Sequence, residues 1–137
     1  QRLVDSAPNS CLAVRLGRRW GFIDKAGKII INPQFDDVRS FAKGLAPARV
    51  GKLWGFVDAT GQLAINPQFD DAGAFAEDLA RVKIAGRWGF IDKSGKYAIN
   101  PQFDEAASFA EGLAQVKVAR RTGYVDTNGK YVWNPSN

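Results

Sequence analysis

The stretch that decides the fold is Arg87-Trp88-Gly89-Phe90-Ile91-Asp92-Lys93-Ser94-Gly95-Lys96. It is one of four related copies, which start their signatures at Trp20, Trp54, Trp88 and Thr122. Successive copies are 34 residues apart, so the spacing holds without insertion or deletion. A fixed period of this length is typical of repeat proteins, in which each unit buries its apolar face only against its neighbours.

Each copy contains a pattern for three short strands joined by tight turns. Residues 79–84 alternate apolar and polar side chains, which is the period of a half-buried strand. Ala85-Gly86 is a two-residue break that suits a hairpin. In the second strand, residues 88–91, Trp and Phe share one face while Gly and Ile share the other.

An Asp-x-x-Gly motif predicts a second hairpin in every copy. The Asp side chain can accept hydrogen bonds from the turn amides, and Gly supplies the positive φ of a type I turn followed by a bulge. The third strand then leads into Asn-Pro-Gln-Phe, where Pro, which has no amide donor, should end the ladder or lie at a sheet edge. The Asp/Gly pairs are Asp24/Gly27, Asp58/Gly61, Asp92/Gly95 and Asp126/Gly129.

A short segment of helical character follows each Asn-Pro-Gln-Phe. In residues 35–44, Asp36 is a candidate N-cap and Gly44 a candidate C-terminal stop. Val38 and Phe41 lie three residues apart, on one helical face. Asp78 stands where Gly44 stands in the first copy, and Asp tolerates the left-handed conformation better than most residues. We therefore expect one or two helical turns here.

These elements predict an all-β fold with short helical turns, built from tandem three-stranded antiparallel meanders. The expected repeats are residues 12–44, 45–78, 79–112 and an incomplete 113–137, after an N-terminal leader or cap at residues 1–11. The first repeat looks one residue short between Leu12 and Trp20. We expect the units to stack into an elongated or curved solenoid-like array, with a closed, propeller-like arrangement as the alternative.

The repeated blocks resemble the bacterial WG-repeat family, also called KWG repeats. Trp-Gly-Phe-Ile-Asp, Asn-Pro-Gln-Phe-Asp and Phe-Ala-Glu-Gly-Leu-Ala carry the resemblance, which covers residues 12–135. It is weakest in the last unit, where Thr122 replaces the signature Trp. The resemblance implies a β-rich repeat array, often part of larger bacterial proteins. It implies no shared enzymatic activity and supplies no ligand-binding residues.

The aromatic and glycine signature has two interpretations. Aromatic rings at equal intervals can form a ladder that stacks on sugars or bases, but rings that recur at the repeat spacing more often form the shared core. We favour the core, and with it a structural role for the signature. Its residues are Trp20, Gly21, Phe22, Trp54, Gly55, Phe56, Trp88, Gly89 and Phe90.

The residue types speak against an enzyme. The chain has no His, which excludes Ser-His-Asp and Cys-His arrangements and the usual Cys/His zinc sites. Paired acids such as Asp36/Asp37 recur at the repeat period, in positions that turns and caps explain. Cys11 is the only cysteine, so it forms no intrachain disulfide and is expected to be an inert thiol. We predict no catalytic residue, no metal and no cofactor.

Composition sets broad limits on partners and compartment. A chain of 137 residues suits one domain, and its net charge of +5 favours an anionic partner. No apolar run approaches the ~20 residues that span a bilayer, and the first residues lack the apolar core of a secretory signal. The chain has no Met, which fits a processed form, a trimmed form or one part of a longer protein. Among compartments we favour export to the periplasm or to the outside of a bacterium.

Basic residues at the tip of the first hairpin are the candidate ligand contacts: Arg18, Arg19, Lys52, Arg87, Arg120 and Arg121. The third strand should return acidic residues to the same end of the unit, where they would pair with much of this charge. We therefore favour a non-enzymatic binding module for another protein, for example at the bacterial envelope. The alternatives are a module for an anionic polymer, such as nucleic acid or a cell-wall polymer, and a structural spacer in a larger bacterial protein.

Overall fold

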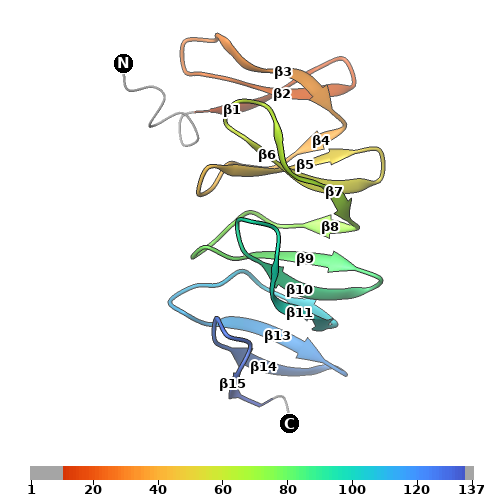
Figure 1. The fold of residues 1–137 in the computed structure, drawn as a ribbon, viewed down its shortest axis with the longest axis vertical. Coiled ribbons are helices and arrows are strands. Elements are labelled where there is room, and N and C mark those ends of the chain that lie inside the picture. Colours follow the sequence, from red (N-terminus) through yellow and green to blue (C-terminus); the bar gives the residue numbers. More distant parts are fainter. Residues whose placement is uncertain (1–10, 135–137) are drawn as a thin grey trace. The chain divides into compact units, whose positions relative to one another are not determined.

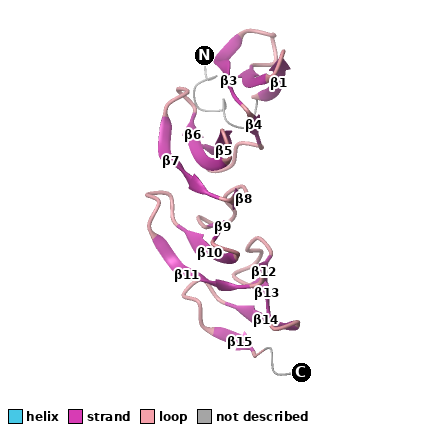
Figure 2. Ribbon diagram, turned by 90° about the vertical axis from the view of Figure 1, so that its right-hand side faces the viewer, coloured by secondary structure: helices cyan, strands magenta, loops and turns pink. Residues whose placement is uncertain are grey.

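The computed structural model describes residues 11–134, and within this range every regular element is a β-strand (Figure 1, Figure 2). The predicted leader therefore lies outside the described residues, apart from Cys11. The strands are β1 Leu12–Leu16, β2 Arg19–Ile23, β3 Ile29–Phe35, β4 Asp37–Val38, β5 Leu45–Val50, β6 Leu53–Asp58, β7 Leu63–Phe69, β8 Asp71–Ala72, β9 Ala80–Ile84, β10 Arg87–Ile91, β11 Tyr97–Phe103, β12 Glu105–Ala106, β13 Ala114–Val118, β14 Arg121–Val125 and β15 Tyr131–Trp133.

The strands form four antiparallel sheets in two compact units, residues 1–68 and residues 69–137. The sheets have the orders β1-β2-β3, β4-β5-β6-β7, β8-β9-β10-β11 and β12-β13-β14-β15. The first two belong to the first unit, except for the last residue of β7, and the other two belong to the second. Each sheet is open, with an edge strand on either side. The predicted all-β tandem meanders are therefore confirmed.

The predicted helical turns are wrong. Residues 35–44 contain no helix, and β4 pairs with β5 of the following repeat through Asp37↔Arg49 and Val38↔Ala48. A helix of this length is marginal by itself, whereas the edge of the next hairpin offers backbone partners at once. The end of one repeat thus supplies the first strand of the next sheet. The equivalent strands β8 and β12 do the same for β9 and β13.

Gly44 ends no helix but forms part of a two-residue turn. Lys43 and Gly44 both have positive φ, 56° and 83°, which is the type I′ pattern of tight hairpins. The backbone amides of Ala42 and Leu45 each donate to the other residue's carbonyl, at 2.9 and 3.1 Å. Asp78 has φ 71° in the equivalent turn, so the expected left-handed conformation is present.

The Asn-Pro segment does not end the ladder, although it does lie on an edge strand. Between the pairs Trp20↔Phe35 and Phe22↔Ile31, β2 advances two residues while β3 advances four. The extra residues form a bulge around Pro33, which a strand edge accepts because Pro has no amide donor. The signature glycine makes room for this bulge. A Cβ added to Gly55 would lie 2.4 Å from the carbonyl oxygen of Ile65 and 2.7 Å from the nitrogen of Pro67.

The first repeat is not one residue short. Leu12 pairs with Ile23, whereas Leu45 pairs with Asp58, one position further along the signature. The residue in the place of Leu45 is therefore Cys11, which packs beside the core of the first unit. Burial raises the pKa of the Cys11 thiol, and the charge of Asp24 raises it further, as expected for an unreactive thiol.

Aromatic rings link consecutive sheets inside each unit. Phe22 packs edge-on against Phe41 at 4.8 Å in the first unit, and Phe90 packs against Phe109 at 4.7 Å in the second. The indoles of Trp54 and Trp88 are only 5% and 9% exposed, so they belong to the packed interior. These contacts are favourable beyond the area they bury.

We predict that Gly55→Ala destabilises the chain by at least about 2 kcal/mol, because its methyl group would overlap the backbone of the bulge. Urea unfolding followed by circular dichroism measures the change. Gly17→Ala is the control: its Cβ would meet open space, and only its positive φ costs about 1 kcal/mol. Equal stability of Gly55→Ala and the parent chain would contradict the role assigned to this glycine.

Candidate functional site

The predicted basic residues all lie at the tips of the first hairpins and are exposed. The two-residue turns hold Arg18, Lys52 and Arg120, while Arg19, Arg87 and Arg121 begin the strands that follow. Arg18 and Arg19 share the tip of hairpin β1–β2, and Arg120 and Arg121 share that of β13–β14. Lys52 lies at the tip of β5–β6 and Arg87 at that of β9–β10.

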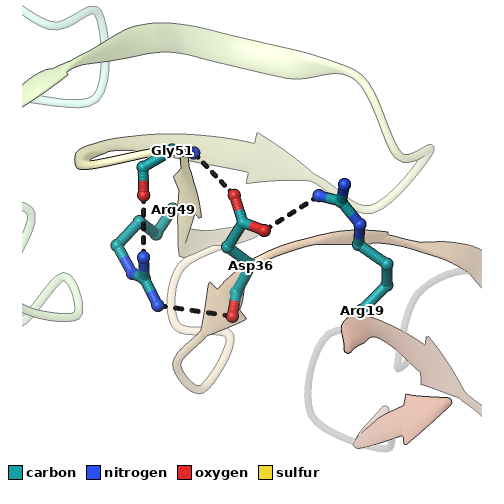
Figure 3. Close-up of polar contacts among 4 residues, drawn as sticks. All are labelled: Arg19, Asp36, Arg49 and Gly51. Atoms are coloured by element: carbon teal, nitrogen blue, oxygen red, sulfur yellow. Dashed lines mark hydrogen bonds and ion pairs between the residues drawn. The ribbon is translucent and has the colours of Figure 1, made fainter. Parts of the chain in front are cut away.

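Asp36 joins the two hairpin tips of the first unit (Figure 3). One carboxylate oxygen accepts from Nη1 of Arg19 at 2.8 Å, and the other accepts from the backbone amide of Gly51 at 2.6 Å. Arg49 completes the arrangement by donating to the carbonyl oxygens of Gly51 and Asp36, at 2.7 and 3.4 Å. The carboxylate therefore neutralises one predicted ligand residue and holds the neighbouring turn.

The second unit repeats this acidic clamp. Asp104 pairs with Arg87 and accepts from the backbone amide of Ala119 at 2.8 Å. Asp70 accepts from the backbone amide of Ala85 at 3.0 Å. These bonds agree with the expectation that the third strand returns acidic residues to the hairpin tips, where they pair with part of the basic charge. In the first unit, the carboxylate of Asp37, next to Asp36 in sequence, accepts from the amide of Val38 at 2.9 Å. Both acids of the pair Asp36/Asp37 therefore have backbone partners.

The other basic residues keep their charge available at the tips. The side chains of Arg18, Lys52, Arg120 and Arg121 make no hydrogen bond or ion pair with any residue between positions 11 and 134.

Sequence reasoning missed the apolar residues beside these cations. Leu16 is 70% exposed, Val50 43% and Leu53 38%. Each flanks a two-residue turn. The alternation of side chains along each strand continues to the residues next to the turn, where no neighbouring sheet covers them. Apolar residues at these positions could therefore have been predicted to be exposed.

A second carboxylate links consecutive repeats in the second unit. Glu77 accepts from the backbone amides of Glu111 and Gly112 in the turn that precedes β13, the latter at 2.8 Å. The two amides follow the pattern of a backbone anion site, here filled by the chain's own side chain. Lys43 stands in the place of Glu77 in the first unit, so a cation replaces the carboxylate there.

The Asp-x-x-Gly turns form as predicted. The amide of Gly27 donates to the carbonyl of Asp24 at 3.0 Å, and Gly27 has φ 87°. In two turns a hydroxyl joins the backbone amides: Thr60 donates to Asp58 at 2.5 Å and Ser94 donates to Asp92 at 2.6 Å. These hydroxyls are the main reason that the pKa of each carboxyl is lowered, with the turn amides adding to the effect.

No group of side chains that could hold a metal ion is present in the part of the chain that the structure describes. No three His, Cys, Asp or Glu side chains converge among residues 11–134. Nor does any helix long and apolar enough to cross a membrane occur in that range.

We predict that Asp36→Ala costs about 1–2 kcal/mol, because it leaves the Gly51 amide without its carboxylate partner. Arg19→Ala removes only the exposed ion pair and should cost less than about 1 kcal/mol. Urea unfolding compares the two variants. Equal losses would show that the clamp depends on the ion pair rather than on the backbone bond.

Acid sensitivity should depend on Ser94. A lowered pKa for Asp92 stabilises the fold at neutral pH, and this contribution disappears as the pH falls below about 4, through the folded-state pKa. Ser94→Ala should raise the pKa of Asp92 and lower stability at pH 7, with the difference from the parent vanishing in acid. Carboxyl NMR titration and unfolding curves measure both, and Ser108→Ala is the control. A pKa of Asp92 that does not move would contradict the assignment.

The comparisons with known proteins agree with this architecture. No curated protein matches the chain. The family model described as WG containing repeat matches three consecutive segments, residues 20–54, 54–88 and 88–119. These matches run through the signature, the Asp-x-x-Gly turn and the Asn-Pro bulge, and together they cover more than half of the chain. The chain therefore belongs to the WG containing repeat family.

Proposed function

We propose that the chain is a non-enzymatic module that binds another protein through the tip surface of its first unit. This tip surface consists of Leu16, Arg18, Val50, Lys52 and Leu53. The observation that carries the proposal is the exposure of three large apolar side chains beside two cations that have no partner among the described residues.

The two tips that form this surface are held side by side. Asp36 binds Arg19 at one tip and the Gly51 amide at the other, so both hairpins are tied to one carboxylate (Figure 3). A surface that is ordered before binding loses less conformational entropy on association. Apolar side chains surrounded by polar ones are the usual composition of a protein–protein interface.

The charge of the tips supports a protein more than an anionic polymer. Arg19 and Arg87, two of the six basic residues, face carboxylates. Those carboxylates would also repel phosphate groups brought close to the tips. Arg120 and Arg121, adjacent and exposed in the second unit, are the feature that favours a polyanion instead. The two functions differ in salt dependence, since phosphate contacts weaken steeply as salt rises.

The experiment is a pull-down from a lysate of the source organism with the immobilised chain. The apolar variant carries Leu16→Ser and Leu53→Ser, the charge variant carries Arg18→Gln and Lys52→Gln, and Val132→Ser is the control for an exposed apolar residue elsewhere. We expect the apolar variant to lose a bound protein at least tenfold, a loss of about 1.4 kcal/mol or more, at both 50 mM and 500 mM salt. Circular dichroism verifies that each variant is folded.

Other outcomes would overturn the proposal. Binding that disappears in high salt or in the charge variant, yet survives in the apolar variant, would indicate an anionic polymer. Retention of the same proteins by all variants would mean that they bind elsewhere than at the tip surface, and retention of none by the parent chain would indicate a structural spacer.

A further inference from the structure

A recess of about 240 Å³ opens in the last sheet, between β12 and β13. Its lining is Glu105, Ala106, Ala107, Gln115, Val116 and Lys117. The volume is below the ~300 Å³ at which pockets for small molecules and cofactors begin, so the recess suits a single side chain.

The equivalent positions in the two preceding sheets are filled by an indole and a cation. In the second sheet, the guanidinium of Arg39 lies 4.1 Å from the ring centre of Trp54. In the third sheet, the guanidinium of Arg81 lies 5.1 Å from the ring centre of Trp88, and the ammonium of Lys83 lies 6.0 Å from it. Such contacts are favourable because the ring face is electron-rich.

The third sheet shows how favourable the stack is. Arg81 lies so close to Gly73 that a Cβ added there would be 2.8 Å from its Nε. That Nε is buried and has no hydrogen-bond partner among residues 11–134. Burying an unpaired donor is costly, so the contact with the indole must contribute to holding the guanidinium there.

The last sheet has lost the ring but kept one cation. Thr122 pairs with Lys117 as Trp88 pairs with Lys83, so the lysine remains in register without its indole. Ala107 and Gln115 stand in the places of Gly73 and Arg81. The recess lies at Ala107 and Gln115, where the third sheet has the guanidinium of Arg81, and next to the pair Lys117↔Thr122, where the third sheet has the indole.

We propose that this recess binds an aromatic side chain, of the indole class, presented by a partner protein. Ala107 offers a methyl group on the same face of the sheet as Lys117, which supplies the cation for the ring face. Gln115 and Glu105 offer oxygen acceptors for an indole N–H. An arginine fits less well, because Lys117 would repel it and the Glu105 carboxylate already lies 4.0 Å from the lysine.

The site is separate from the tip surface in residues and in ligand chemistry. The tip surface is confined to the first unit, whereas every lining residue of the recess belongs to the second. Loss of binding at one of them leaves the other unaffected, so the two proposals are tested separately.

The test is an NMR titration of the full chain with N-acetyl-L-tryptophanamide, followed through the amide signals of the lining residues. We expect saturable shifts with a Kd in the millimolar range. Thr122→Trp, which restores the repeat's own indole, should weaken this binding at least tenfold. Thr127→Trp, in an exposed turn of the same repeat, is the control and should leave it unchanged. Lys117→Gln should weaken it several-fold without abolishing it.

Three results would overturn the proposal: no saturable shift up to about 10 mM probe, unchanged binding by a folded Thr122→Trp, or tighter binding of N-acetyl-L-argininamide. Tighter binding of free L-tryptophan than of its blocked amide would identify a pocket for a metabolite, and would overturn the assignment to a partner protein. Ala107→Leu fills the recess from β12 and replaces Thr122→Trp if that variant does not fold.

Discussion

The close approach of the signature glycine to the Asn-Pro bulge is the constraint on which the rest of the structure depends. At Gly21, Gly55 and Gly89 an added Cβ would lie within 3 Å of the backbone of the bulge. The bulge lets the third strand continue past Pro to a buried Phe. Only then can the chain leave the sheet in the direction of the next repeat. The pairing of Gly with Asn-Pro is therefore a backbone requirement.

Carboxylates then tie consecutive repeats inside each unit. Asp36 and Asp104 bind an arginine on one hairpin tip and a backbone amide on the next, and Glu77 binds two amides in a later turn. These groups occupy the positions where paired acids suggest chemistry. Their bonds to backbone amides show that they are structural. The same bonds neutralise part of the basic charge at the tips.

Departures from the repeat are where distinct surfaces arise. Leu53 occupies the position of Arg19 and Arg87, and it leaves an apolar group at a tip. Thr122 occupies the position of Trp54 and Trp88, and it leaves a recess beside Lys117. The regular positions hold the sheets together, since their environment is the same in each repeat.

The sequence by itself determined the repeat, the three strands of each meander and the Asp-x-x-Gly turns, because period-two alternation and turn chemistry act over a few residues. Only the tertiary structure decided the course of residues 35–44. Asp36 looked like a helix cap because its true partners, Gly51 and Arg19, lie in other hairpins. The same holds for Cys11 in the place of Leu45 and for the recess beside Thr122. Each of these features depends on contacts with residues of another strand or repeat, and a pattern of neighbouring residues in the sequence does not contain those contacts.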